Sequence, residues 1–161
     1  METVLKDFTD WEGCSGEPPR PGQLSEVLGR KDVYIYSGHG SGSHYMPLHD
    51  IEKLRVRVVA MLLGCNSGEL LRIGRNLDPW GAAYSYLLGT SPAMVGFLWP
   101  VTDVDVDNWT IRFLDYWLNG RQGNMLQAVA DQRGSFANFS NTAALVVYGL
   151  PISVKSKSVS D

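Results

Sequence analysis

The chain has 161 residues, of which 44% are hydrophobic and 19% are charged, and its formal net charge is -3 at pH 7. These values are typical of one globular domain and exclude a disordered chain. No apolar run approaches the roughly 18 residues that a membrane-spanning helix needs, and the lysines and arginines form no basic stripe. We therefore expect no membrane and no direct nucleic-acid partner. The opening residues lack the pattern of a secretory signal, so the expected location is the cytoplasm and nucleus.

Helix and strand patterns alternate along the chain. In chain order they are a short helix (22–29), a strand (32–38), a helical turn (48–54), a strand (56–63), a helix (79–88), a strand (93–99), two helices (103–119 and from 125) and a strand (144–150). The four strands are apolar almost throughout, as parallel strands covered on both faces must be. The alternation predicts a single α/β domain, residues 1–161, with a mainly parallel sheet flanked by helices on both faces.

The longer helices have recognisable ends and apolar faces. The residues expected to begin or end them are Asp78, Pro79 and Gly89, then Thr102 or Asp103, then Asn124. Short polar side chains suit a helix start, and glycine suits its end. The residues expected to point inward are Trp109, Phe113, Tyr116 and Trp117, followed by Met125, Leu126, Val129 and Ala130.

Two reactive side chains each follow a predicted buried strand. His39 lies among glycines in YIYSGHGSGSHY (34–45), and Cys65 follows the apolar run VRVVAMLLG (56–64). Ligands of open α/β sheets bind beyond the carboxyl ends of the strands. If the two strands are neighbours, about 5 Å apart, both side chains face one crevice.

A thiolate beside an imidazole performs nucleophilic acyl transfer, in which sulfur attacks a carbonyl and the imidazolium protonates the leaving amine. We expect Cys65 at a strand-to-helix turn, with the segment GELL as the helix that stabilises the thiolate. The backbone N–H groups of Cys65 and Gly40 are candidates for the oxyanion hole. Gly64 is expected to admit the substrate backbone, and the glycines around His39 to clear room for a peptide.

Other interpretations of these residues remain open. SGHGSGS could be a flexible turn with an exposed histidine, and Cys65 could be a small buried hydrophobic residue. A metal site formed by His39, His44, His49 and Cys65 is disfavoured because the spacing fits no common ligand pattern. The glycine-rich stretch lacks a phosphate-loop ending, so no cofactor is expected. Two cysteines are too few for a disulfide framework, and Cys14 is taken as an unremarkable free thiol.

Three carboxylates follow the third predicted strand: Asp103, Asp105 and Asp107 in LWPVTDVDVDNW (98–109). An aspartate recessed in a pocket would select arginine or lysine through a charge-assisted hydrogen bond. The alternative is that these carboxylates only stabilise a helix N-terminus.

The stretches YIYSGHGSG, MLLGCNSGEL, YLLGTSPAMVGFLWPVTDVDVDNWT and VVYGLPIS together resemble the C-terminal protease domain of separase, from about Trp11 to Ser153. Separase is a caspase-like cysteine endopeptidase that opens cohesin rings at anaphase. The resemblance implies that His39 is the catalytic histidine and Cys65 the nucleophile. It implies cleavage after arginine, three residues beyond an acidic residue, in the kleisin subunit of cohesin. Asp103 is then the best candidate for reading arginine.

The resemblance also implies partners and a boundary. Securin would be an inhibitory chaperone that occupies the crevice, and upstream segments of the same full-length protein would supply a first strand that this chain lacks. Residues 154–161 are expected to form a flexible tail. The chain departs from the family pattern at Asn66, where serine is common, and at Pro100, where aspartate is common.

Two other functions share the same features. Caspase-like CHAT proteins have a similar histidine–glycine strand end and cysteine-bearing strand, with other substrates. A catalytically inactive module could use the crevice to bind a peptide without cutting it. Retention of both His39 and Cys65 favours the endopeptidase.

Overall fold

The computed structural model describes residues 11–72, 74–75, 77–119 and 123–154. They form two compact units. The sheet unit comprises residues 11–101 and 144–150, and the helical unit comprises residues 102–143 and 151–154. Nearly all of the tail expected at 154–161 lies outside the described residues. Among the helices described, none is long and apolar enough to cross a membrane.

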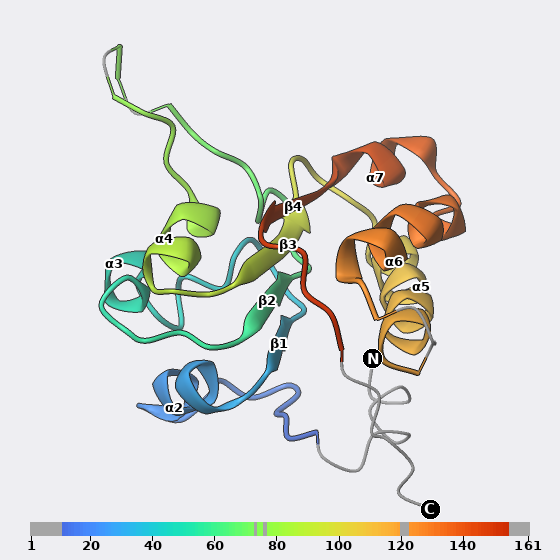
Figure 1. Cartoon of the computed structure of the whole chain (residues 1–161). Coiled ribbons are helices and arrows are strands. Elements are labelled where there is room, and N and C mark those ends of the chain that lie inside the picture. The colour runs from blue at the N-terminus through green and yellow to red at the C-terminus, as the bar shows by residue number, and fades with distance from the viewer. Residues whose placement is uncertain (1–10, 73, 76, 120–122, 155–161) are drawn as a thin grey trace, which may run out of the picture. The chain divides into compact units, whose positions relative to one another are not determined.

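All four predicted strands are present in the sheet unit, and each is shorter than its apolar run. They are β1 (Val33–Tyr36), β2 (Val59–Leu62), β3 (Ala93–Phe97) and β4 (Leu145–Gly149). Their order is β1-β2-β3-β4, as Figure 1 shows. The first three are parallel, and β4 runs antiparallel to β3. The mainly parallel α/β architecture is therefore confirmed.

Three helices of the sheet unit pack against the sheet: α2 (Gln23–Arg30), α3 (Leu48–Ile51) and α4 (Ala82–Leu88). They bury Leu28, Ile51 and Tyr86 against alternate residues of β2. Successive strand residues point to opposite faces. All four β2 residues are nonetheless buried, so β2 is covered on both faces, as the apolar run predicted.

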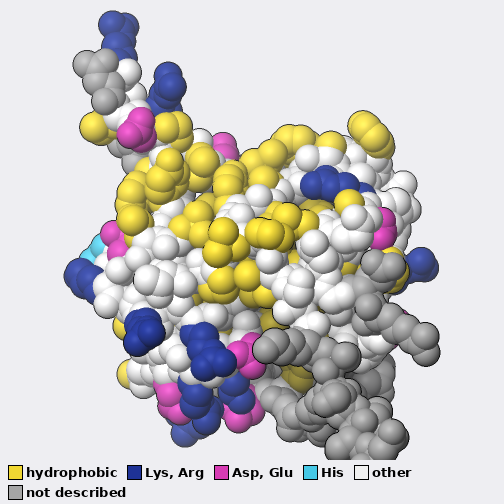
Figure 2. All heavy atoms as spheres, in the orientation of Figure 1, with side chains coloured by type: hydrophobic (Ala, Val, Ile, Leu, Met, Phe, Trp, Pro, Cys, Tyr) yellow, Lys and Arg dark blue, Asp and Glu magenta, His cyan; other side chains and the backbone are white. Residues whose placement is uncertain are grey.

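The helix α4 begins three residues later than predicted. Leu71 and Trp80 exchange backbone hydrogen bonds of 2.8 Å. These bonds close the base of an arm, formed by the described residues between them, that extends from the sheet unit (Figure 1). The helix begins only after Gly81, where a side chain would overlap the carbonyl of Glu69. Gly89 follows its last residue, as predicted. Figure 2 shows Lys or Arg side chains at the tip of the arm, next to hydrophobic ones.

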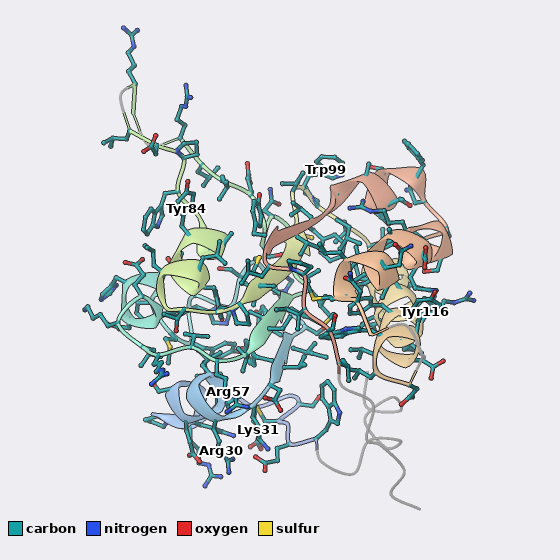
Figure 3. The ribbon with its side chains drawn as sticks, viewed as in Figure 1. Arg30, Lys31, Arg57, Tyr84, Trp99 and Tyr116 are labelled. Carbon is teal, nitrogen blue, oxygen red and sulfur yellow. The ribbon has the colours of Figure 1, made fainter. Side chains whose placement is uncertain are left out.

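Surface contacts tie chain segments of the sheet unit together near β1. Glu12 pairs with Lys31 at 2.8 Å and with Arg30 at 3.2 Å, and these cations are labelled in Figure 3. The hydrogen bond from Lys31 lowers the pKa of Glu12. Arg57 pairs with Asp32 at 3.0 Å, next to the starts of β2 and β1. Exposed pairs of this kind add little stability, about 0–1 kcal/mol each.

The helical unit contains α5 (Asp103–Leu114), a π-helical turn (Asp115–Asn119), α6 (Met125–Gln132), a 3-10 turn (Arg133–Ser135) and α7 (Phe139–Ala144). Its core is a series of stacked rings, with centroids 4.9 Å apart for Trp109 and Phe113 and 5.5 Å apart for Phe113 and Trp117. These inward positions are confirmed. Tyr116 is only half-buried, and its hydroxyl donates to Asp131 at 2.8 Å.

The predictions for α6 are correct at its start and partly wrong along its face. The side chain of Asn124 accepts a hydrogen bond from the backbone N–H of Leu126 at 2.9 Å, so the predicted cap is present. Met125 and Val129 are buried as expected. Leu126 and Ala130 are exposed, and Ala128 is buried instead. The buried face has the spacing of three and four residues that one helix face requires.

Candidate active site

The loops that carry His39 and Cys65 leave neighbouring strands side by side. In the β1–β2 register, Tyr36 lies opposite Leu62. The N–H of Leu63 donates to the carbonyl of Tyr36 at 2.8 Å, which continues the pairing past the strand ends. His39 and Cys65 each come three residues after this registered pair. The condition set for a shared crevice, that the two strands are neighbours, is therefore met.

Gly64, the residue before Cys65, is in close contact with the histidine loop. A side chain at Gly64 would overlap the carbonyl oxygens of Gly38 and Gly40, and its Cβ would lie 2.7 Å from the Gly40 nitrogen. Gly64 was expected to admit a substrate backbone. Instead, the backbone that approaches it belongs to the residues flanking His39, so glycine is needed to bring the two loops together.

The histidine loop is held by the last residue of its own strand. The hydroxyl of Tyr36 donates to the carbonyl of His39 at 3.0 Å. A Cβ at Gly38 would lie 2.6 Å from the Tyr36 hydroxyl, and one at Gly42 would lie 3.2 Å from its ring. Gly40 and Gly42 have positive φ angles of 62° and 74°, as expected. The space cleared by Gly38 and Gly42 is thus occupied by the Tyr36 ring.

Burial raises the pKa of Tyr36 above its ordinary value, with a further contribution from Tyr45. The hydroxyl therefore stays protonated, and able to donate, throughout the neutral range. The ring centroids of Tyr36 and Tyr45 are 6.3 Å apart in an edge-to-face arrangement.

Cys65 begins a tight turn, and residues 66–70, which include GELL up to Leu70, form no helix: the expected strand-to-helix turn is wrong. The hydroxyl of Ser67 donates to Leu62 and accepts from the N–H of Phe97 at 3.1 Å. Gly68 then donates to the carbonyl of Phe97 at 2.9 Å. These bonds fasten the turn to β3 and direct GELL into the arm, so the helix expected from this segment, and its dipole, are absent.

The half-buried thiol of Cys65 lies against the backbone of Val101. The N–H of Val101 donates to Sγ at 3.4 Å, and the thiol is 3.5 Å from the Val101 carbonyl. The amide contact suits a thiolate, since it brings a hydrogen-bond donor to the sulfur. The carbonyl contact requires the protonated thiol.

Two backbone donors stand next to these reactive groups without an acceptor. Among the described residues, nothing accepts a hydrogen bond from the N–H of Gly40 or from that of Cys65. These are the two groups predicted to form an oxyanion hole. Donors left unpaired within a folded loop are available to a ligand oxygen.

The other two histidines, His44 and His49, contact the side chains of the residues that follow them. The ring of His44 lies 3.9 Å from that of Tyr45, and His49 lies 3.2 Å from Asp50. In the part of the chain that the structure describes, no three His, Cys, Asp or Glu side chains are grouped so as to hold a metal ion. Cys14 is exposed.

The three aspartates lie at the start of α5, in the helical unit. Asp105 accepts a hydrogen bond from Asn141 at 2.7 Å, and Asn141 also donates to Thr102 at 2.9 Å. Asp105 thus ties α7 to the beginning of α5, which is a structural role. Asp103 is exposed in the first turn, and Asp107 is half-buried. A role for any of them in reading substrate stays a prediction.

Sequence reasoning missed three groups of this site: the Tyr36 hydroxyl, the buried Ser67 and the backbone of Val101. Tyr36 was taken only as a strand residue. The signal that could have found it is a tyrosine two residues before a glycine, because the missing side chain leaves room for the ring to fold back.

Comparisons with known proteins identify the family and agree with this fold. The family model described as "Separin, protease domain" matches residues 1–106. Mouse separin is 37% identical over 150 residues, which cover 92% of this chain and 7% of the mouse protein. Separin of Saccharomyces cerevisiae is 35% identical over 145 residues, covering 84% of this chain and 9% of the yeast protein. The chain thus spans less than a tenth of the length of these relatives.

Solved structures give the same result. A crystal structure of the Saccharomyces cerevisiae separase–securin complex superposes with a TM-score of 0.86 at 32% identity, covering 95% of this chain and 11% of the matched chain. A second structure of that complex gives a TM-score of 0.80 at 31% identity. The fold is that of a protease domain. The chain belongs to the separin protease domain family, which decides against the CHAT alternative.

Proposed function

We propose that this chain supplies the catalytic pair of a cysteine endopeptidase, with Cys65 as nucleophile and His39 as acid–base group. The observation that carries the proposal is the contact of Gly64 with Gly38 and Gly40, because it brings the backbone on both sides of His39 against the residue before Cys65. Membership of a protease family supports the same assignment.

The reaction proceeds by acylation and hydrolysis. The Cys65 thiolate attacks the scissile carbonyl carbon, and the oxyanion that forms is bound by the unpaired N–H groups of Gly40 and Cys65. The C–N bond then breaks, and the departing amine takes a proton from the His39 imidazolium. Water, deprotonated by neutral His39, attacks the thioester and releases the acid and the thiol.

The substrate is a peptide cleaved after arginine, three residues beyond an acidic residue, and the expected protein is the kleisin subunit of cohesin. Asp103 is the candidate for binding the arginine. It comes two residues after Val101 in the sequence, and the backbone of Val101 contacts the nucleophile. A carboxylate binds a guanidinium through charge-assisted, bidentate hydrogen bonds.

The partner expected for this site is securin, acting as an inhibitory chaperone. The support is that both matched yeast structures are separase–securin complexes. Further segments of a longer protein would act together with this chain, because the relatives are more than ten times its length. Its place of action would be the nucleus and cytoplasm.

The proposal is tested by cleavage of a Glu-x-x-Arg peptide by the full-length protein that carries this chain. Cys65→Ser and His39→Ala should each lower kcat by at least about a hundredfold, since general acid–base catalysis alone contributes 10²–10⁴-fold. Cys14→Ser is the matched control and should leave kcat unchanged. Unaltered cleavage by either site variant would show that the assignment is wrong.

A peptide-binding module without activity is the alternative outcome. An arginine acyloxymethyl ketone separates the two, because only a competent thiolate forms a covalent adduct. Mass spectrometry should find the label on Cys65 and not on Cys14. Binding of the arginine peptide without labelling of Cys65 would favour the module.

A further inference from the structure

Tyr36 is the one described side chain that donates a hydrogen bond to the backbone of the histidine loop. It reaches the carbonyl of His39 at 3.0 Å, and its ring fills the space above Gly38 and Gly42. Tyr36 is the last residue of β1, and the backbone of β1 is held by its pairing with β2. Tyr36 therefore connects a rigid strand to one particular carbonyl of the loop.

That carbonyl belongs to the same peptide unit as the N–H of Gly40. A peptide unit is planar, and in the trans form its C=O and N–H point to opposite sides. The described chain contains no cis peptide bond. A hydroxyl that holds the His39 oxygen on one side therefore directs the Gly40 N–H to the other side.

The Gly40 amide also lies next to the turn that carries the nucleophile. Its nitrogen lies beside Gly64, the residue before the nucleophile, and its N–H has no acceptor among the described residues. Gly40 has a φ angle of +62°, a region that glycine enters without strain and also leaves easily. A glycine amide in such a loop needs a second contact to fix its direction.

We propose that Tyr36 is a positioning residue of the active site: by holding the His39 carbonyl, its hydroxyl sets the direction of the Gly40 N–H that binds the oxyanion. The inference rests on the proposed function and extends it. The effect is confined to the amide, because coupled rotations about the Cα–C bond of His39 and the N–Cα bond of Gly40 turn the peptide plane without moving the imidazole. The Tyr36 hydroxyl thus affects the stabilisation of the oxyanion in the transition state and not the reactivity of the Cys65 thiolate.

The test compares Tyr36→Phe with the unaltered full-length protein, using the Glu-x-x-Arg peptide. The variant keeps the ring and removes only the hydroxyl. Loss of one neutral hydrogen bond of about 1 kcal/mol predicts a fall in kcat of about fivefold. KM should stay within about twofold, since the oxyanion exists only in the transition state. Tyr34→Phe, which removes another hydroxyl from the same strand, should change neither constant.

A second measurement separates positioning from a general loss of structure. Alkylation of Cys65 by iodoacetamide at pH 6.5, followed by mass spectrometry of its peptide, depends on the thiolate and forms no oxyanion. Tyr36→Phe should be alkylated at the unaltered rate, while His39→Ala should be alkylated more slowly.

Each other outcome overturns a defined claim. An unchanged kcat in Tyr36→Phe, or a parallel fall in kcat and alkylation rate, would refute the positioning role while leaving the Cys–His pair intact. A full-length protein that cleaves no peptide, with alkylation of Cys65 independent of His39, would refute the proposed function and this inference with it.

Discussion

The two loops of the candidate site follow neighbouring parallel strands, yet they are held in different ways. The histidine loop is largely exposed, bends at Gly40 and Gly42, and depends on one side chain, Tyr36. The cysteine turn is held by a buried hydroxyl, that of Ser67, and by one backbone hydrogen bond, from Gly68 to Phe97 of β3. The nucleophile is thus attached to the core, and the histidine loop is attached to the nucleophile's turn through glycine contacts.

This difference predicts how the loops respond to change. A methyl group that overlaps backbone held by hydrogen bonds cannot be accommodated without separating the two loops. A methyl group that contacts the edge of an aromatic ring can displace the ring at a small cost in free energy. Glycine-to-alanine substitutions test the contrast directly, because they add one methyl group at known positions.

The largest effect is expected for Gly64→Ala. Its methyl group would overlap the backbone of Gly38 and Gly40, so the two loops must separate. Overpacking of this kind costs about 1–3 kcal/mol of unfolding free energy. A displacement of about 1 Å in the reacting groups can lower kcat by about a hundredfold. Urea unfolding and peptide cleavage measure the two effects.

Gly29→Ala is the matched control for that substitution. Gly29 lies within α2, where an added Cβ would meet only the Arg55 carbonyl at an ordinary 3.7 Å. Alanine is favoured over glycine in a helix by about 1 kcal/mol, so this variant should be slightly more stable. Equal behaviour of the two variants would contradict the close contact at Gly64.

Ser67→Ala should destabilise the cysteine turn. The hydroxyl is buried and makes two hydrogen bonds, one to Leu62 and one from Phe97. Their removal should cost about 1–3 kcal/mol in thermal or urea unfolding. Ser43→Ala, at an exposed position of the histidine loop, should cost less than about 0.5 kcal/mol. A neutral Ser67→Ala would mean that the turn is held by its backbone bonds alone.

Gly42→Ala is expected to have the smallest effect of the three. Its φ angle of +74° disfavours a side chain by about 1–2 kcal/mol. The new methyl group would lie 3.2 Å from the Tyr36 ring, which can shift. Cleavage by this variant should fall by less than about tenfold, an amount that corresponds to 1.4 kcal/mol. A fall in kcat as large as that of Gly64→Ala would contradict the proposed difference between the two loops.

The sequence predicted the four strands correctly from apolar runs such as 56–63. The prediction that all four are fully buried holds for β2 and β3 and is wrong for β1 and most of β4, which are only half-buried. The sequence also placed Cys65 and His39 beyond strand ends, since the end of a run is visible in the residues, but that the two strands are neighbours came only from the structure. Sequence reasoning failed where the outcome depends on contacts between distant segments. GELL has a helical composition, but the bonds of Ser67 and Gly68 to Phe97 direct it into the arm.

The Tyr36 contact was hidden for the same reason. A tyrosine in a strand pattern gives no information on whether its hydroxyl folds back onto the following loop. That contact exists only because Gly38 and Gly42 leave room for the ring. The role of Asp105 was likewise set by Asn141, which lies 36 residues away along the chain.

The pairing of His39 with Cys65 is the central claim, and the rate of Cys65 alkylation by iodoacetamide tests it most directly. In the full-length protein, an imidazole beside the sulfur should make Cys65 react faster at pH 6.5 than it does in His39→Ala. Equal alkylation rates in the two proteins would contradict the account.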